Sequence, residues 1–224
     1  MTYDELESWV RQNGDKKYKE FTSSLSGTSL LFYGVRLPII RKKVKELKSD
    51  SELVFPTIYL NKSFEINYLY IMSNIAKRHS FEEQLNYIIL NKKYLKCWQI
   101  TDSIPSYLKK AKFELFFKYF KKNIKSSDEF LVREMWIIAL KYTSFDEVLV
   151  LLDYIVNTDK YYIMMAEAWF LATLAIYQKD AVKHLLENNQ IDKELKKKAI
   201  QKIIDSFRID DKYKTDCRLI RSKL

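Results

Sequence analysis

The stretch FEINYLYIMSNI, residues 64–75, indicates the fold most clearly. Phe64, Tyr68, Ile71 and Ile75 recur three or four positions apart, a spacing that places them on one face of an α-helix. The same spacing recurs in two later stretches, at Phe145, Val148, Leu152 and Ile155 and at Leu195, Ala199 and Ile203. Only 3 Gly and 3 Pro occur in 224 residues, too few for the tight turns of a sheet-rich protein. The chain is therefore predicted to be all-helical.

Helix starts are marked by a Ser or Thr followed three residues later by Glu, a pattern typical of capping boxes. It occurs at Thr2/Glu5, Ser49/Glu52, Ser80/Glu83, Ser126/Glu129 and Ser144/Glu147. Breaks between helices are expected near residues 14, 27–37, 50, 62, 79, 91, 104, 125, 143, 158, 178, 190 and 209. Helices of about 10 to 18 residues, taken in pairs, give units of roughly 30–40 residues, the range of helical-hairpin solenoids. One continuous domain over residues 1–224 is predicted.

The charge balance favours a polyanionic partner. The 39 Lys and Arg residues exceed the 29 Asp and Glu residues, giving a formal charge of +10, although a Lys-rich surface also serves solubility alone. Cys97 and Cys217 show no disulfide or zinc spacing, which fits a reducing cytoplasm. No signal peptide or membrane span is expected. His79 and His184 lie in no metal-binding motif and no Gly-rich phosphate loop occurs, so neither a metal nor a cofactor is predicted.

The segment Cys97–Ser103 carries the first candidate chemistry. If it is helical, Trp98 and Asp102 lie four residues apart and face the same way. An aromatic face beside a carboxylate can stabilise a cation from two directions. The alternative is structural: Asp102 or Ser103 caps a helix whose first turn holds Pro105, and Trp98 belongs to the core. Local features alone favour this alternative.

Two further segments contain unusual residues. Arg133 lies in an otherwise apolar stretch, where a guanidinium needs an anion. That anion is either an internal carboxylate, supplied by Glu129 or Glu134, or a phosphate of a ligand. Trp169 is flanked by small residues, Ala168 and Ala172, which would let another helix or a ligand backbone approach closely. A Trp in such a run is more often part of the core.

Taken in order, these segments resemble the AlkD-type DNA alkylation repair glycosylases, which are built from HEAT-like helical repeats. The resemblance begins at residues 33–42, YGVRLPIIRK, which look like that family's Gly-Val-Arg-x-Pro-x-x-Arg element. It continues through the Trp-x-x-x-Asp pair at Trp98 and Asp102, through Arg133, and through the Ala-Trp-x-Leu element at residues 168–171. It closes with residues 198–208, KAIQKIIDSFR. The short motifs occur in the family's order over nearly the whole chain.

The resemblance implies a fold and an activity. The fold would be a right-handed α–α superhelix of HEAT-like helix pairs with a concave basic face. The activity would be hydrolysis of the N-glycosidic bond of cationic N3- or N7-alkylated purines in duplex DNA, without base flipping. By position, Asp102 would be the catalytic carboxylate, Trp98 and Trp169 would flank the damaged nucleotide, and Arg133 would hold a phosphate near the lesion.

Six basic residues are candidates for tracking the duplex, although a solvated surface role is commoner for any single lysine. They are Lys109, Lys110, Lys112, Lys198, Lys202 and Arg208. The protein is expected to act as a cytoplasmic, nucleoid-associated monomer whose partner is duplex DNA.

The segment around Arg133 departs from the family pattern, because Glu134, Met135 and Trp136 are bulkier than the small residues expected there. Trp136 would narrow the cleft if it faced it. Two alternatives to the glycosylase therefore remain. One is a catalytically weak or silent relative that binds DNA. The other is a helical-repeat scaffold for protein partners, whose basic face meets an acidic protein.

Overall fold

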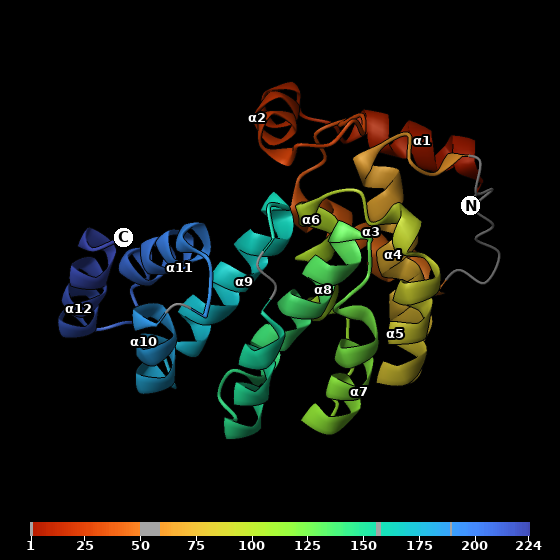
Figure 1. Cartoon of the computed structure of the whole chain (residues 1–224). Coiled ribbons are helices and arrows are strands. Elements are labelled where there is room, and N and C mark those ends of the chain that lie inside the picture. The colour runs from red at the N-terminus through yellow and green to blue at the C-terminus, as the bar shows by residue number, and fades with distance from the viewer. Residues whose placement is uncertain (1, 50–58, 156–157, 189) are drawn as a thin grey trace. The chain divides into compact units, whose positions relative to one another are not determined.

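The computed structural model of the chain describes residues 2–49, 59–155, 158–188 and 190–224. Within these ranges the chain consists of helices, turns and loops, together with one isolated parallel bridge between Leu31 and Ser63 (Figure 1). The predicted all-helical fold is confirmed, with consecutive helices packed on one another as in an α–α repeat. Among the described residues, no helix is both long and apolar enough to cross a bilayer.

Contacts divide the chain into two compact units, Met1–Ala111 and Lys112–Leu224. The first of these is unit 1 and the second is unit 2. The predicted organisation as a single domain over residues 1–224 stays a prediction, as does the concave shape of its basic face.

Unit 1 is built around the apolar helix α4. Its helices are α1 (Tyr3–Gln12), α2 (Lys16–Ser26), α3 (Leu37–Ser49), α4 (Phe64–Lys77), α5 (Phe81–Leu90) and α6 (Trp98–Thr101), with the short 3-10 helices η2 (Lys92–Tyr94) and η3 (Ile104–Ser106). Helix α4 packs against α1, α3 and α5. Its predicted stripe of Phe64, Tyr68, Ile71 and Ile75 is buried, and each such side chain contributes about 1.5–3 kcal/mol to folding.

A buried carboxylate holds the loop before α3 against α4. Glu65 is 1% exposed and accepts hydrogen bonds from the backbone N–H groups of Tyr33, Gly34 and Val35, the shortest at 2.8 Å. Burial raises the pKa of Glu65, and these donors oppose the rise. Gly34 has a φ of +87°, and a Cβ there would lie 2.2 Å from the carbonyl oxygen of Asp15. The glycine of the Gly-Val-Arg element is therefore required by the loop itself.

Unit 2 contains the second set of helices. They are α7 (Phe113–Asn123), α8 (Glu129–Ala139), α9 (Tyr161–Leu174), α10 (Lys179–Glu187), α11 (Lys193–Asp205) and α12 (Asp211–Ser222), with the 3-10 helices η4 (Leu140–Tyr142) and η5 (Asp146–Tyr154). Helix α9 packs between α8 and α11. The small residues Ala168 and Ala199 are fully buried, which lets these helices approach closely. The predicted stripe of Leu195, Ala199 and Ile203 is buried, as expected.

The predicted capping boxes hold at two helix starts. At α1, the Thr2 hydroxyl accepts from the Glu5 N–H and the Glu5 carboxylate accepts from the Thr2 N–H. At α5, Ser80 accepts from the Glu83 N–H, while the Glu83 carboxylate accepts from the His79 N–H, one residue earlier than expected. The Ser49/Glu52 pair lies partly outside the described residues.

The other two capping predictions are wrong. Helix α8 starts after Asp128, whose carboxylate accepts from the Leu131 N–H, so Ser126 does not cap it. Ser144 lies outside η5, which has Phe145 at its N-cap position and no side-chain cap. At α8 the carboxylate of Asp128 replaces Ser126 as the cap, because Asp caps helices as well as Ser does.

The predicted apolar stripe of residues 145–155 is also wrong. Phe145 is 52% exposed, whereas Val148 and Leu151 are buried. Residues 146–154 form a 3-10 helix instead of an α-helix. Because a 3-10 helix has three residues per turn, its buried face follows a spacing of three. The three-residue spacing of Val148 and Leu151 occurs on one face of an α-helix and of a 3-10 helix alike. The sequence pattern therefore did not distinguish the two helix types.

Candidate nucleic-acid interface

The predicted Trp98–Asp102 pair lies on one helical turn of unit 1. Helix α6 is only four residues long, and the Asp102 N–H donates to the Trp98 carbonyl at 2.8 Å. The segment is therefore helical, as the prediction required. Both side chains are half-buried, so Trp98 is not a core residue. Ser103 occupies the N-cap position of η3, but its hydroxyl donates to the Gln99 carbonyl instead of capping that helix.

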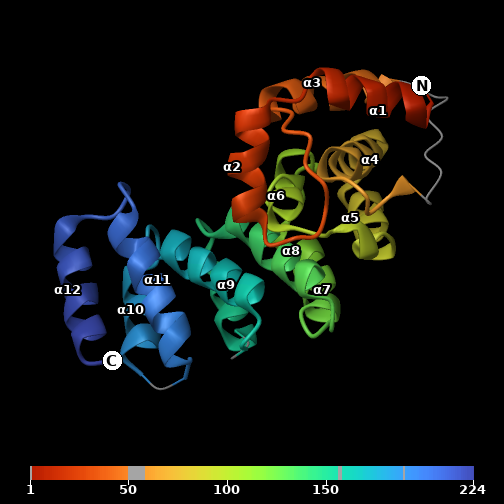
Figure 2. The same ribbon diagram turned by 90° about the horizontal axis from the view of Figure 1, so that it is seen from above.

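The indole of Trp98 is fixed by a long-range hydrogen bond. Its Nε1–H donates to the carbonyl oxygen of Leu25, at the end of α2, over 3.1 Å. Figures 1 and 2 show α2 next to α6. Gly27 caps the C-terminus of α2 in the left-handed conformation that is typical of this position. Because its N–H group is engaged, Trp98 can offer a ligand only its ring face and carbon edge.

Asp102 lies among polar and buried neighbours. The Thr101 hydroxyl is 3.3 Å from its Oδ1 and also 3.0 Å from the Trp98 carbonyl. Burial, with smaller contributions from the charges of Asp102 and Glu65, raises the pKa of the neighbouring Cys97 to about 12. The Cys97 thiol therefore stays protonated and is a poor nucleophile. The Asp102 carboxyl is the acidic group that this turn can offer to a cationic substrate.

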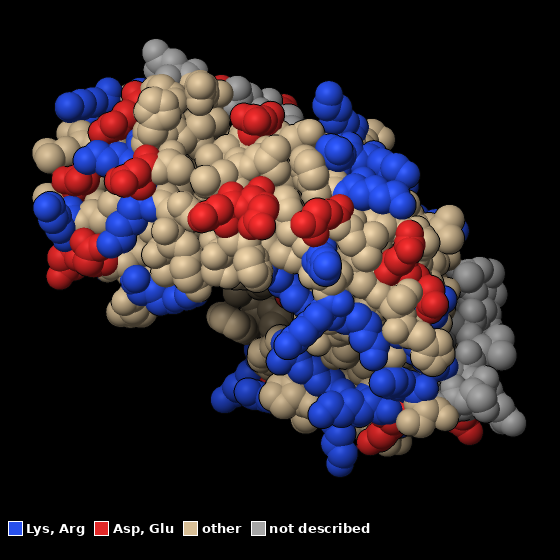
Figure 3. All heavy atoms as spheres, turned by 90° about the horizontal axis from the view of Figure 1, so that it is seen from below, with Lys and Arg blue, Asp and Glu red and all other residues tan. Residues whose placement is uncertain are grey.

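Helix α3 carries basic residues that are not among the six predicted DNA contacts. Arg41, Lys42, Lys45 and Lys48 are all exposed, and the spacing of Arg41, Lys45 and Lys48 places these three on one helix face. Figure 3 shows Lys and Arg side chains gathered at the lower right, in the part of unit 1 that contains α3. The positive charge of Arg41 opposes the rise that burial causes in the pKa of Tyr107, which directly follows η3. The spacing of these cations can be read from the sequence, and it would have predicted a basic helix face here.

The basic residues predicted after the Trp98 segment are exposed. Lys109 and Lys110 end unit 1 and Lys112 begins unit 2, at the N-cap position of α7. The Lys109 N–H donates to the Gln84 side-chain oxygen at 2.7 Å, which fixes the backbone there while its ammonium group reaches solvent.

Arg133, predicted to hold a phosphate, lies inside unit 2. It is 5% exposed, and its Nη1 donates to the Tyr162 carbonyl at 2.9 Å. One turn earlier on α8, the Glu129 carboxylate accepts from the Tyr162 N–H at 2.9 Å. This N–H belongs to the first turn of α9, where a helix leaves its donors unpaired. Glu129 and Arg133 thus clamp both backbone groups of Tyr162. The buried position favours the internal alternative, and the phosphate role stays a prediction.

Trp136 does not face a cleft within unit 2, so the prediction that it narrows one is not supported by its position. It is fully buried, with ring centroids 5.1 Å from Phe120 and 5.0 Å from Phe170. The bulky residues after Arg133 fill the core instead. Glu134 is also buried on this helix.

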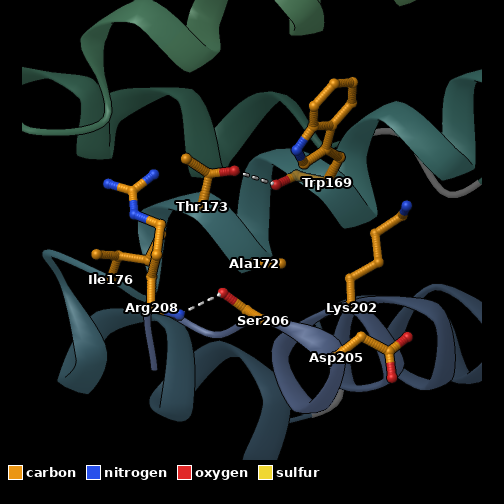
Figure 4. Close-up of a pocket in the computed structure, with 8 residues that line it drawn as sticks. All are labelled: Trp169, Ala172, Thr173, Ile176, Lys202, Asp205, Ser206 and Arg208. Atoms are coloured by element: carbon orange, nitrogen blue, oxygen red, sulfur yellow. Dashed lines mark hydrogen bonds between the residues drawn. The ribbon is translucent and has the colours of Figure 1, made fainter. Parts of the chain in front are cut away.

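Trp169 lines a surface pocket of unit 2 with a volume of about 330 Å³. One wall is formed by Trp169, Ala172 and Thr173 of α9, together with Ile176 just after that helix. The other is formed by Lys202 and Asp205 of α11, together with Ser206 and Arg208 from the turn that follows it. Figure 4 shows Lys202 and Arg208 at opposite sides of this pocket, with Ser206 between them. Trp169 is 38% exposed, so it is accessible to a ligand.

Both cations that line this pocket lie beside an aromatic ring. The Lys202 ammonium is 6.0 Å from the centroid of the Trp169 ring. The Arg208 guanidinium is 5.8 Å from the centroid of the Tyr177 ring and donates to the Tyr177 hydroxyl at 2.8 Å. Lys198, the remaining predicted contact, lies one turn before Lys202 on α11 and is half-buried. The structure thus brings Trp169, Lys202 and Arg208 together and leaves Arg133 in the core.

The fold and these surfaces define an all-helical protein with aromatic and basic side chains gathered on accessible faces. A family model for DNA alkylation repair enzymes matches residues 4–203. The chain belongs to this family. A comparison with curated proteins found no match. The matched region includes the Trp98–Asp102 turn, Trp169 and Lys202, and it ends before Arg208 and α12.

Proposed function

We propose that this DNA alkylation repair protein is a glycosylase that hydrolyses the N-glycosidic bond of N3- or N7-alkylated purines in duplex DNA. The observation that carries the proposal is the accessible Trp98–Asp102 turn in a chain of this family. Alkylation at N3 or N7 makes the purine cationic and therefore a good leaving group. The protein needs only to stabilise the charge that appears on the sugar.

In the proposed reaction, the bond between C1′ and the purine nitrogen breaks and its electron pair goes to the base. The base leaves neutral, and the deoxyribose becomes an oxocarbenium-like cation. The Asp102 carboxylate stabilises this cation and accepts a proton from the water that adds to C1′, leaving an abasic site. The Trp98 ring, held by Leu25, adds cation–π attraction of about 0.5–2 kcal/mol.

The DNA backbone would be held by exposed or half-buried cations. In unit 1 these are Lys109, Lys110 and the α3 residues Arg41, Lys42, Lys45 and Lys48, and in unit 2 they are Lys112, Lys198, Lys202 and Arg208. Trp169, beside Lys202, would contact the backbone of the damaged strand. Arg133 would act indirectly, by holding the start of the helix that carries Trp169. That the base stays stacked during the reaction follows from the family resemblance.

Base release from methylated DNA tests the proposal. Wild-type protein is expected to release 7-methylguanine from methylated duplex DNA. Asp102→Asn should lower the rate by about 10²-fold or more, because general-base and electrostatic contributions of one carboxylate are of this size. Asp153→Asn, which makes the same charge change at an exposed position of η5, is the matched control and should leave the rate unchanged.

Three outcomes separate the proposed function from its alternatives. Release that depends on Asp102 supports the glycosylase. Salt-sensitive binding of duplex DNA without release would identify a catalytically silent DNA-binding member of the family. Failure to bind DNA even at low salt would exclude both and leave a scaffold for protein partners.

A further inference from the structure

Phe207 is the most exposed large apolar side chain among the described residues, at 103% of its reference accessibility. It lies in the turn between α11 and α12, directly after Ser206 and before Arg208, which both line the Trp169 pocket. This turn follows the part of the chain that matches the family model.

The turn that presents Phe207 is anchored on both sides. Ile209 is 4% exposed and packs into the core of unit 2. Asp210 forms an ion pair with Lys179 and caps α12 by accepting from the Tyr213 N–H at 2.9 Å. On the other side, the Ser206 hydroxyl accepts from the Arg208 N–H at 3.3 Å. The exposure of the ring is therefore a property of a fixed turn.

A single exposed apolar residue needs no explanation, but Phe207 is not alone. Trp169 is 38% exposed and Tyr177 is 47% exposed. Each has a cation beside its ring, Lys202 from the last turn of α11 and Arg208 from the turn after that helix. Asp205 is the acidic side chain in this pocket lining, and it accepts a hydrogen bond from Gln201. Two cations against one carboxylate leave this surface positive.

We propose that Phe207 stacks on an unpaired base of DNA, while Lys202 and Arg208 hold the phosphates beside it. Exposed aromatic rings interleaved with cations are the means by which proteins bind single-stranded nucleic acid. A fully exposed ring needs a base face that is available, and within an intact duplex both faces of each base are covered by its neighbours. The site therefore favours DNA with unpaired nucleotides over intact duplex. The inference uses the DNA binding of the proposed function, but not its hydrolysis step.

Binding of two labelled DNAs, measured by fluorescence anisotropy, tests this site. One is an intact duplex, and the other has the same sequence with a short central bulge of unpaired nucleotides. Wild-type protein should bind the bulged DNA about tenfold more tightly, the size expected of one base stacked on an aromatic ring. Phe207→Ala should abolish the preference and leave intact-duplex binding unchanged, and Phe207→Trp should restore it.

Leu219→Ala is the matched control, because Leu219 is an exposed apolar residue on α12 of the same unit. It should keep the preference for bulged DNA. Equal wild-type affinity for the two DNAs would overturn the inference, as would a Phe207→Ala variant that weakens both equally or neither. The bulge preference can hold without any release of 7-methylguanine, and release can occur without the preference. Failure of the inference is therefore distinct from failure of the glycosylase proposal.

Discussion

The two tryptophans of the candidate sites, Trp98 and Trp169, have opposite surroundings. Trp98 lies on a single helical turn beside a carboxylate, and its N–H is tied to the Leu25 carbonyl. Trp169 lies on a helix of 14 residues beside an ammonium group, in a pocket with a second cation. In the proposed function, the two tryptophans would make different kinds of contact with DNA. The carboxylate side suits a cation that forms during a reaction, and the cationic side suits phosphates that are charged throughout.

The two regions also differ in how they are supported. The short helix α6 depends on a hydrogen bond from Trp98 itself, so its functional side chain is also a structural one. The long helix α9 is held by other residues, namely the Glu129 and Arg133 side chains that clamp Tyr162. In unit 2, a substitution should therefore change either stability or DNA binding. In unit 1, substitution of Trp98 should change both.

The largest expected effect on stability is that of Arg133→Ala. Removing a buried guanidinium leaves the Tyr162 carbonyl and neighbouring buried groups unsatisfied, and should lower the free energy of unfolding by about 3–5 kcal/mol. Urea unfolding measures this, with Arg218→Ala at an exposed position of α12 as the control. A variant with nearly wild-type stability but weakened DNA binding would instead support the predicted role of Arg133 as a phosphate ligand.

A smaller effect is expected when each tryptophan is replaced by Phe. Trp98→Phe removes the donor to the Leu25 carbonyl, and should cost about 1 kcal/mol of folding free energy. Trp169→Phe keeps a ring at a partly exposed position and should change stability by less than about 0.5 kcal/mol. Both are measured by urea unfolding at the same protein concentration. Equal losses of folding free energy in the two variants would mean that the hydrogen bond from Trp98 to the Leu25 carbonyl adds no stability of its own.

The smallest effect is expected for single cations. Lys202→Gln should reduce the slope of log Kd against log salt concentration by about 0.9, because one fewer phosphate is neutralised. Lys45→Gln on α3 should do the same if the basic face of unit 1 also contacts DNA. Anisotropy titrations over a series of salt concentrations measure the slope. Lys223→Gln, at an exposed position near the C-terminus, should leave it unchanged, and a Lys202 variant with the wild-type slope would remove that residue from the interface.

The sequence alone determined the helical architecture and its family. Helix positions follow from apolar spacing and from local capping residues, so most helix boundaries agree with the expected breaks. The stripe of α4 and the Trp98–Asp102 turn were predicted because each depends on residues within a few positions of one another. Where two helix types share one spacing, as in residues 146–154, the local pattern could not choose between them.

Only the tertiary structure decided which partners these residues have. The acceptor of Trp98 is 73 residues away, and that of Arg133 is 29 residues away and is a backbone carbonyl. The apolar pattern around Trp136 could not say whether the ring faces a cleft or the core, where it lies. The exposure of Phe207 likewise depends on Ile209 and Asp210 anchoring its turn. Periodicity records which face of a helix is apolar, but the group that covers that face, or leaves it open, is set by packing between segments distant in the chain.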